Sequence, residues 1–138
     1  MKQLLFYVFI SVTLFSCVSE EVYLQNGIKK YEAKKYKEAI AAFSKAIEIK
    51  PNFKEAYYNR ALVKSELKDF NGAIADYNKA LEINSNDADS YCNRGMAKAE
   101  LQDYKGAIAD YDKAIEINPN DNIAFYNRAL DKSALKDY

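Results

Sequence analysis

The 138-residue chain has no histidine and no tryptophan, and it has little cysteine, proline or glycine. The absence of histidine excludes a Ser-His-Asp triad, a Cys-His pair and every histidine-containing metal site. Two cysteines are too few for a cysteine-rich zinc site or a disulfide framework. Two prolines and four glycines are too few for an all-β chain with many tight turns. The composition therefore indicates a helical protein that lacks the chemical groups of most hydrolases.

An excess of charge of either sign is also absent. Twenty Lys and Arg balance twenty Asp and Glu, so the formal net charge is zero at pH 7. This balance argues against a strongly basic nucleic-acid-binding protein and against an acidic disordered tail. Gly72 and Gly106 do not form a glycine-rich phosphate loop. We expect no nucleic-acid partner, no cofactor and no metal, and we expect no catalytic role for Cys92, because no histidine can activate its thiol.

The longest apolar run lies at the N-terminus. It extends from Leu4 to Phe15 after Lys2, and its 12 residues are fewer than the roughly 20 that a membrane-spanning helix needs. A positive start, a short apolar run and a small residue at its end are typical of a secretory signal peptide. We expect residues 1–16 to form this signal peptide and residues 17–19 to form a short tether.

The apolar run ends in Leu14-Phe15-Ser16-Cys17. This segment resembles the lipobox of bacterial lipoproteins, whose cysteine becomes the lipid-modified N-terminus. The resemblance implies lipidation at Cys17 and attachment to a membrane of the bacterial cell envelope, because two or more lipid chains anchor a protein stably. The acidic pair Glu20-Glu21 resembles the export signal of some outer-membrane lipoproteins, so we expect the outer membrane or the cell surface. The alternative is an ordinary signal peptide in which Cys17 has no role.

The rest of the chain is one unit repeated at steps of 34 residues. Three stretches align at this spacing: Lys37-Glu38-Ala39-Ile40, Asn71-Gly72-Ala73-Ile74 and Lys105-Gly106-Ala107-Ile108. The period and pattern resemble the tetratricopeptide repeat (TPR) family, whose unit is a helix–turn–helix. The units are residues 20–53, 54–87 and 88–121, with a partial fourth at 122–138. The resemblance implies an all-α, right-handed solenoid of antiparallel hairpins.

Small and aromatic residues recur at fixed positions, counted from 1 within each unit. Position 8 is small (Gly27, Ala61, Gly95, Ala129), and position 24 is aromatic (Phe43, Tyr77, Tyr111). Small residues let two helices approach closely, and aromatic rings fill the gaps beside them. We therefore expect helices over 20–33, 37–50, 54–67, 71–84, 88–101, 105–118 and 122–135.

Polar residues also recur. Asp69, Asp103 and Asp137 are expected to cap second helices, and Asn52, Asn86 and Asn120 to do the same for first helices. Arginine at position 7 accompanies aspartate at position 23 in the two middle units only. We predict the ion pairs Arg60–Asp76 and Arg94–Asp110, against the alternative of independent surface charges.

The TPR resemblance implies a concave groove lined by positions 2, 5, 6, 9, 12 and 13 of the first helices. Position 6 carries asparagine, whose amide both donates and accepts and so can hold a peptide backbone. The alternative is that asparagine recurs only because the unit was duplicated. The groove lacks the position-5 lysine with which some TPR proteins bind an acidic C-terminus, so we expect an extended segment with apolar or basic side chains. The predicted groove residues are Glu55, Tyr58, Asn59, Leu62, Glu66, Asp89, Cys92, Asn93, Met96, Glu100, Tyr126, Asn127 and Leu130.

The resemblance implies a non-enzymatic module that binds a protein or peptide. Two other readings stay open: an interaction region of a longer protein, such as an enzyme or its accessory, and a structural solenoid that stacks end to end. The fourth unit reaches only position 17 at Tyr138. We therefore expect either that residues 122–135 form a capping helix or that the chain is a piece of a longer protein.

Overall fold

The computed structural model describes residues 19–136, and within them the chain is all helical. The helices are α2 (Glu20–Glu32), α3 (Tyr36–Ile49), α4 (Lys54–Glu66), α5 (Phe70–Ile83), α6 (Ala88–Glu100), α7 (Tyr104–Ile117) and α8 (Asn122–Ala134). Each end lies within one residue of the predicted end. None of these described helices is long and apolar enough to cross a membrane.

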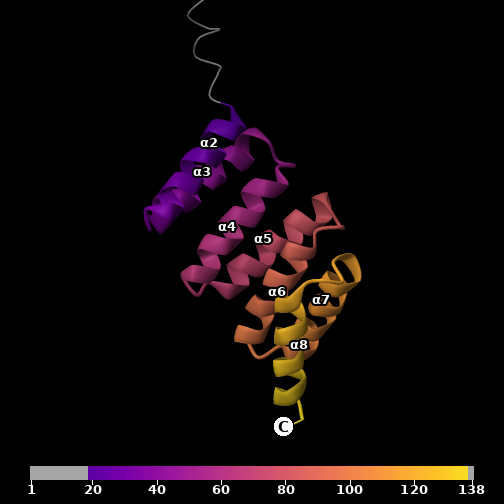
Figure 1. Ribbon diagram of the computed structural model, residues 1–138. Coiled ribbons are helices and arrows are strands. Elements are labelled where there is room, and N and C mark those ends of the chain that lie inside the picture. Colours follow the sequence, from indigo (N-terminus) through magenta and orange to yellow (C-terminus); the bar gives the residue numbers. More distant parts are fainter. Residues whose placement is uncertain (1–18, 137–138) are drawn as a thin grey trace, which may run out of the picture.

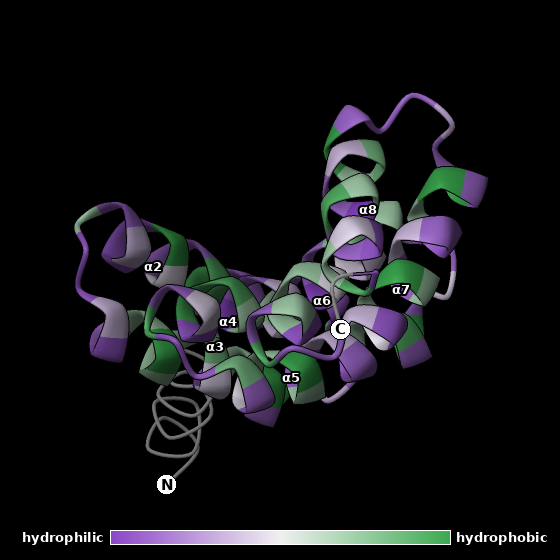
Figure 2. Cartoon of the chain, turned by 90° about the horizontal axis from the view of Figure 1, so that it is seen from below, coloured by the Kyte–Doolittle hydropathy of each residue, from purple (hydrophilic) through white to green (hydrophobic). Residues whose placement is uncertain are grey.

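The helices pair into three hairpins, α2–α3, α4–α5 and α6–α7, followed by the single helix α8 (Figure 1). The first helix of each unit contacts the first helix of the next, so α2, α4, α6 and α8 form one layer. Figure 2 shows this layer on one side of the row and α3, α5 and α7 on the other, with α8 rising beside α7. The predicted architecture of three full units and a partial fourth is confirmed.

The core of each hairpin is an aromatic ring packed against a small residue. Phe43, Tyr77 and Tyr111 are almost fully buried, as are Ala39, Ala73 and Ala107 of the same three helices. A Cβ atom added to Gly95 would lie 2.7 Å from Cε1 of Tyr111, a distance that side-chain atoms do not tolerate. The small residues are therefore required by the close approach of the helices.

The predicted arginine–aspartate pairs are confirmed. Arg94 donates from Nε and Nη2 to the two carboxylate oxygens of Asp110, at 2.9 and 2.6 Å. Arg60 and Asp76 make the same bidentate contact at 2.8 and 2.7 Å. Both aspartates are buried, and each also pairs with a lysine at 2.8 Å, Lys98 or Lys64.

The same arginines also join one unit to the preceding one. Nη1 of Arg60 donates to Oγ of Ser44 at 2.9 Å, and Nη1 of Arg94 donates to Oδ1 of Asn78 at 2.7 Å. Arg128 has no position-23 partner among the described residues. It pairs with Asp112, which occupies the same position in its unit as Ser44 and Asn78 do in theirs. The side chains of Arg60 and Arg94 therefore each link the two helices of their own hairpin and also link that hairpin to the preceding one.

The predicted helix caps are partly right. Asp69 and Asp103 accept from the backbone N–H groups of Gly72 and Gly106 at 3.0 Å, as expected, while Asp137 lies outside the described residues. The assignment of first-helix caps to asparagine is wrong. These helices begin one residue later than that assignment requires, so their N-cap residues are Phe53, Asp87 and Asp121 in place of Asn52, Asn86 and Asn120. Only Asp121 caps with its side chain.

The ion-pair network predicts a large loss of stability for Asp110→Ala. The change leaves Arg94 and Lys98 partly buried without their carboxylate, and breaking such a pair costs about 3 kcal/mol of unfolding free energy. Urea unfolding followed by circular dichroism measures the loss. The matched control is Asp112→Ala on the same helix, which removes an exposed pair with Arg128 and should cost at most about 1 kcal/mol. Equal losses in the two variants would contradict the assigned role of Asp110.

Candidate peptide-binding groove

The layer of first helices presents a hollowed surface along α4, α6 and α8. One pocket of about 450 Å³ lies between α4 and α6, and the residues that line it include Leu62, Glu66, Asn93, Met96 and Glu100. A second pocket, of about 480 Å³, lies between α6 and the start of α8. Because Asn93 and Met96 line both pockets, the two adjoin along α6, and together they are called the groove.

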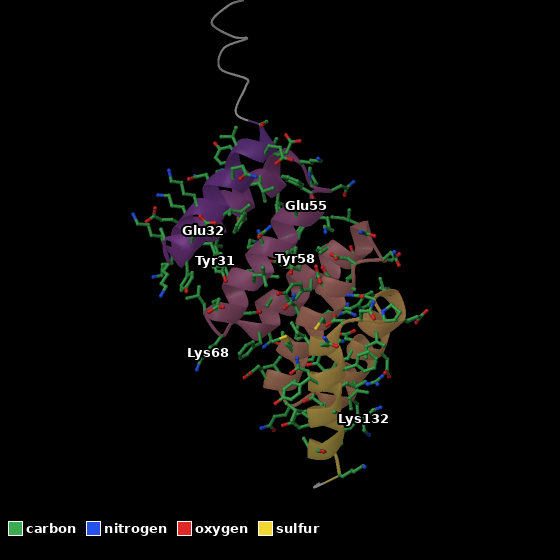
Figure 3. The ribbon with its side chains drawn as sticks, in the orientation of Figure 1. Tyr31, Glu32, Glu55, Tyr58, Lys68 and Lys132 are labelled. Carbon is green, nitrogen blue, oxygen red and sulfur yellow. The ribbon has the colours of Figure 1, made fainter. Side chains whose placement is uncertain are left out.

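Seven of the thirteen predicted groove residues line these two pockets: Leu62, Glu66, Asp89, Cys92, Asn93, Met96 and Glu100. The other six lie on the same helices but outside both pockets. Among them, Tyr126 and Leu130 of α8 are 66% and 50% exposed, so the α8 end of this layer carries uncovered apolar surface. Figure 3 shows Tyr58 along α4 and Lys68 in the turn that follows this helix.

The asparagine column is held in place by its own helices. Nδ2 of Asn59 donates to the carbonyl of Glu55 at 2.7 Å, and Nδ2 of Asn93 donates to the carbonyl of Asp89 at 2.9 Å. Asn93 also donates to the Tyr58 hydroxyl at 3.1 Å, which links α6 to α4. Both side-chain carbonyl oxygens, Oδ1 of Asn59 and Oδ1 of Asn93, therefore have no hydrogen-bond donor within the described residues.

Burial and nearby negative charge raise the pKa of two groups, Cys92, which lines the second pocket, and Tyr58 on α4. Burial, followed by the charges of Asp121 and Asp89, raises the pKa of the Cys92 thiol to about 12. Burial, followed by the charges of Asp89 and Asp87, raises the pKa of Tyr58 to about 12. At neutral pH Cys92 is therefore a thiol rather than the reactive thiolate.

The sequence analysis missed several residues of the two pockets, which come from turns, from α5 and also from the first helices themselves. In the first pocket these are Ser65, Lys68, Phe70, Tyr77 and Ala97, and in the second Asn118, Asn120, Asp121, Asn122 and Ile123. The prediction considered only first-helix positions, so it missed the residues of the turns and of α5. Ser65 and Ile123 stand at groove positions 12 and 2 but were not included in the predicted set. A comparison of the turns between units would have identified Asp121, which occupies the same position as Asp87.

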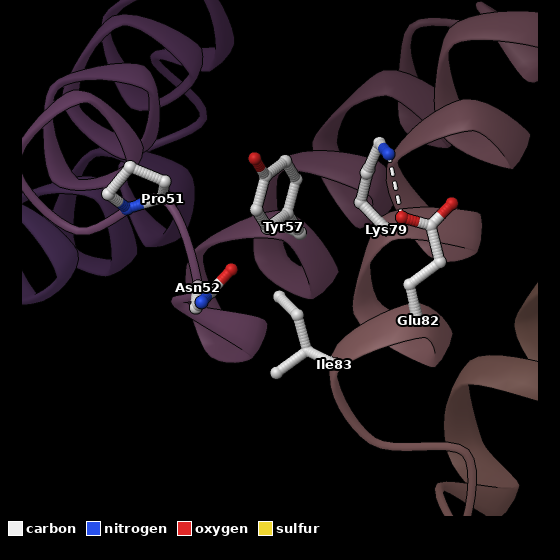
Figure 4. Close-up of a pocket in the computed structure, with 6 residues that line it drawn as sticks. All are labelled: Pro51, Asn52, Tyr57, Lys79, Glu82 and Ile83. Atoms are coloured by element: carbon white, nitrogen blue, oxygen red, sulfur yellow. Dashed lines mark hydrogen bonds and ion pairs between the residues drawn. The ribbon is translucent and has the colours of Figure 1, made fainter.

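Another hollow, of about 500 Å³, lies between the α3–α4 turn and the end of α5 (Figure 4). Asn52, which does not cap α4, lines it together with Pro51 and Tyr57. The charged groups in this hollow, Lys79 and Glu82, pair with each other at 2.6 Å. Because these two charges neutralise each other, the hollow offers no free charge to a ligand.

Comparison with known proteins gives the family. A tetratricopeptide repeat profile matches residues 88–121, and a TPR repeat profile matches residues 29–68 and 63–102. The chain therefore belongs to the tetratricopeptide repeat family. A search of curated protein sequences gave no significant match.

Solved structures of TPR domains superpose closely on the chain. The first TPR of Spaghetti (RPAP3), bound to the HSP90 peptide SRMEEVD, is 30% identical with a TM-score of 0.84, and the match covers 86% of this chain and 94% of that one. The first TPR domain of human RPAP3 is 30% identical with a TM-score of 0.82, over 86% and 93% of the two chains. The Arabidopsis OM64 TPR domain is 28% identical with a TM-score of 0.82, over 84% and 96%.

The raised pKa of Cys92 predicts slow labelling. At pH 8 its thiolate fraction is on the order of a thousandfold below that of an ordinary cysteine, because the pKa lies several units above the usual value of about 8.5. The rate of reaction with a disulfide reagent, measured on protein with Cys17→Ser, should fall accordingly and recover in denaturant. Native-state labelling as fast as that of a free cysteine would contradict this environment.

Proposed function

We propose that the protein is a non-enzymatic interaction module that holds an extended protein segment in the groove along α4, α6 and α8. The observation that carries the proposal is that the two pockets adjoin at Asn93 and Met96 on α6. A groove of this kind suits an extended chain, because the two pockets can take side chains while the amide of Asn93, which lines both, meets the backbone. The RPAP3 structure, in which a TPR of the same family is bound to a peptide, supports this function.

The chemistry of this groove differs from what the RPAP3 peptide requires. The peptide SRMEEVD carries two Glu and one Asp. The groove of this chain carries Glu66, Asp89 and Glu100, none of which has an ion-pair partner among the described residues. Like charges facing each other across an interface lower affinity. We therefore propose that the groove does not capture acidic C-terminal tails of this type.

The groove function predicts that Asn59→Ala combined with Asn93→Ala weakens binding but leaves the fold intact. The double variant removes two amides proposed to hydrogen-bond the backbone of the bound segment. Each such bond is worth about 1 kcal/mol, so affinity should fall roughly tenfold or more. Binding is measured with peptides selected from a display library, and thermal unfolding is followed by circular dichroism. Because Asn93 also donates to Tyr58, Tyr58→Phe is the matched control for the loss of that bond.

Unchanged affinity in the double variant would move the binding site away from this groove. A loss of affinity accompanied by a clear fall in melting temperature would instead identify the asparagines as structural. Either result would overturn the assignment of Asn59 and Asn93 as peptide-binding residues.

We also propose that the protein is exported and anchored to the cell envelope through a lipid on Cys17. The support is the sequence alone, the short apolar run and the Leu14-Phe15-Ser16-Cys17 ending, and these residues lie outside those that the structure describes. The outer membrane or the cell surface is the proposed location. Anchoring there would raise the local concentration of the groove next to partners on the same membrane.

Cys17→Ser should release the protein from the membrane fraction. The lipid chains provide the membrane affinity, and the variant has no residue to carry them. Fractionation followed by mass spectrometry of the mature N-terminus measures the change. Cys92→Ser is the matched control and should stay with the membrane. A wild-type protein with an unmodified N-terminus would contradict the lipid anchor.

A further inference from the structure

The boundary between α4 and α6 contains a lysine held between two carboxylates. Nζ of Lys54 lies 3.3 Å from Oδ2 of Asp87 and 3.9 Å from Oε1 of Glu55. The same ammonium lies 5.9 Å from the centre of the Tyr58 ring. At this boundary the chain therefore supplies its own cation, and an aromatic ring covers part of it.

One repeat later, between α6 and α8, the carboxylates remain and the lysine is gone. At the equivalent positions 34 residues later, Ala88 stands in place of Lys54 and Cys92 in place of Tyr58. The carboxylates are kept, with Asp89 in place of Glu55 and Asp121 in place of Asp87. Neither Asp89 nor Asp121 has an ion-pair partner among residues 19–136. Asp121 accepts only backbone N–H groups, those of Ile123 and Ala124 at 3.1 and 3.0 Å. Two carboxylates thus flank a position that holds a lysine in the preceding unit.

A pocket lies at the boundary where Ala88 replaces the lysine and Cys92 replaces the tyrosine. The hollow of about 480 Å³ between α6 and α8 is lined by both carboxylates, by Cys92 and by Met96, and no Lys or Arg lines it. Cys92 lines this pocket together with both carboxylates, whose charges add to burial in raising the pKa of its thiol. Met96 is 42% exposed and offers a thioether surface along which an aliphatic side chain can lie.

We propose that this pocket, between Asp89 and Asp121, receives a lysine or arginine side chain of the segment that occupies the groove. The cationic head takes the place that the Lys54 ammonium occupies at the preceding boundary, and its methylene stem lies against Met96 and Cys92. The neighbouring pocket suits a cation less well, because Lys68 lines it beside Glu66 and Glu100. The proposal rests on the groove function and adds the chemical class of the partner.

The test begins with a random seven-residue peptide display library selected on the mature Cys17→Ser protein. Enriched peptides should share one Lys or Arg at a fixed position. A selected peptide is then synthesised in two forms, with lysine and with Nε-acetyl-lysine, which keeps the stem and removes the charge. Acetylation should weaken binding roughly three- to tenfold, as expected for the loss of a partly exposed ion pair.

A double-mutant cycle assigns the effect to this pocket. In protein with Asp89→Asn and Asp121→Asn the acetylated and unmodified peptides should bind within about twofold of each other. Asparagine keeps the capping oxygen at the start of α8, so this variant should remain folded. Ala88→Lys restores the internal cation and should compete with the lysine peptide, weakening its binding about as much as acetylation does.

The outcomes separate this proposal from the groove function. Enriched peptides without Lys or Arg, or an acetylation effect that persists in the asparagine variant, would overturn the cation pocket while leaving the groove function in place, provided that binding still depends on Asn59 and Asn93. A selection that enriches no peptide would overturn both.

Discussion

The close approach of two helices at a residue with almost no side chain is the constraint on which the whole row of hairpins depends. The rings of Phe43, Tyr77 and Tyr111 fill the space opposite position 8, and the glycine at this position in α6 has no room for a Cβ atom. The Phe43 ring belongs to the same buried cluster as Val63 of the following unit. Each ring therefore sets the spacing inside its hairpin, and the Phe43 ring also contributes to the contact with the next unit. The first helices line up as a result, and their outer faces form the groove.

The position-7 arginines, Arg60 and Arg94, fix the relative orientation of the packed helices. A ring against a small residue tolerates some rotation, whereas a guanidinium that contacts two oxygens of one aspartate in a fixed plane does not. Arg60 and Arg94 also lie over the position-4 rings of Tyr57 and Tyr91, at 5.6 and 5.3 Å. Buried ion pairs contribute little net stability compared with apolar residues of equal size. Their position here, between helices and between units, fits a role in fixing the register of one hairpin on the next.

The periodic part of this molecule could be predicted from the sequence because each unit repeats the same evidence. Helix ends agree within one residue, and the Arg60–Asp76 and Arg94–Asp110 pairs follow from positions that change together. The aperiodic part was harder to predict. The caps Phe53, Asp87 and Asp121 depend on where the chain leaves the turn, which spacing alone does not specify.

Asp131 illustrates the same limit. It stands at the position of Val63 and Ala97, it is buried, and its Oδ2 has no hydrogen-bond partner among the described residues. Burial raises its pKa, since the charged form loses its hydration. The repeat pattern predicts an apolar residue there, and nothing in residues 19–136 explains the carboxylate.

Periodicity also creates a problem of register for a ligand. If every unit offered the same asparagine and the same apolar surface, a bound segment could shift by one unit and meet equivalent contacts. A departure from the repeat that is chemically distinct removes this ambiguity. The replacement of Lys54 and Tyr58 by Ala88 and Cys92 produces such a departure, because only the later boundary keeps its carboxylates without an internal lysine. On this argument the repeated residues supply affinity for an extended backbone, and the exceptions to the repeat determine where along the groove a particular side chain must lie.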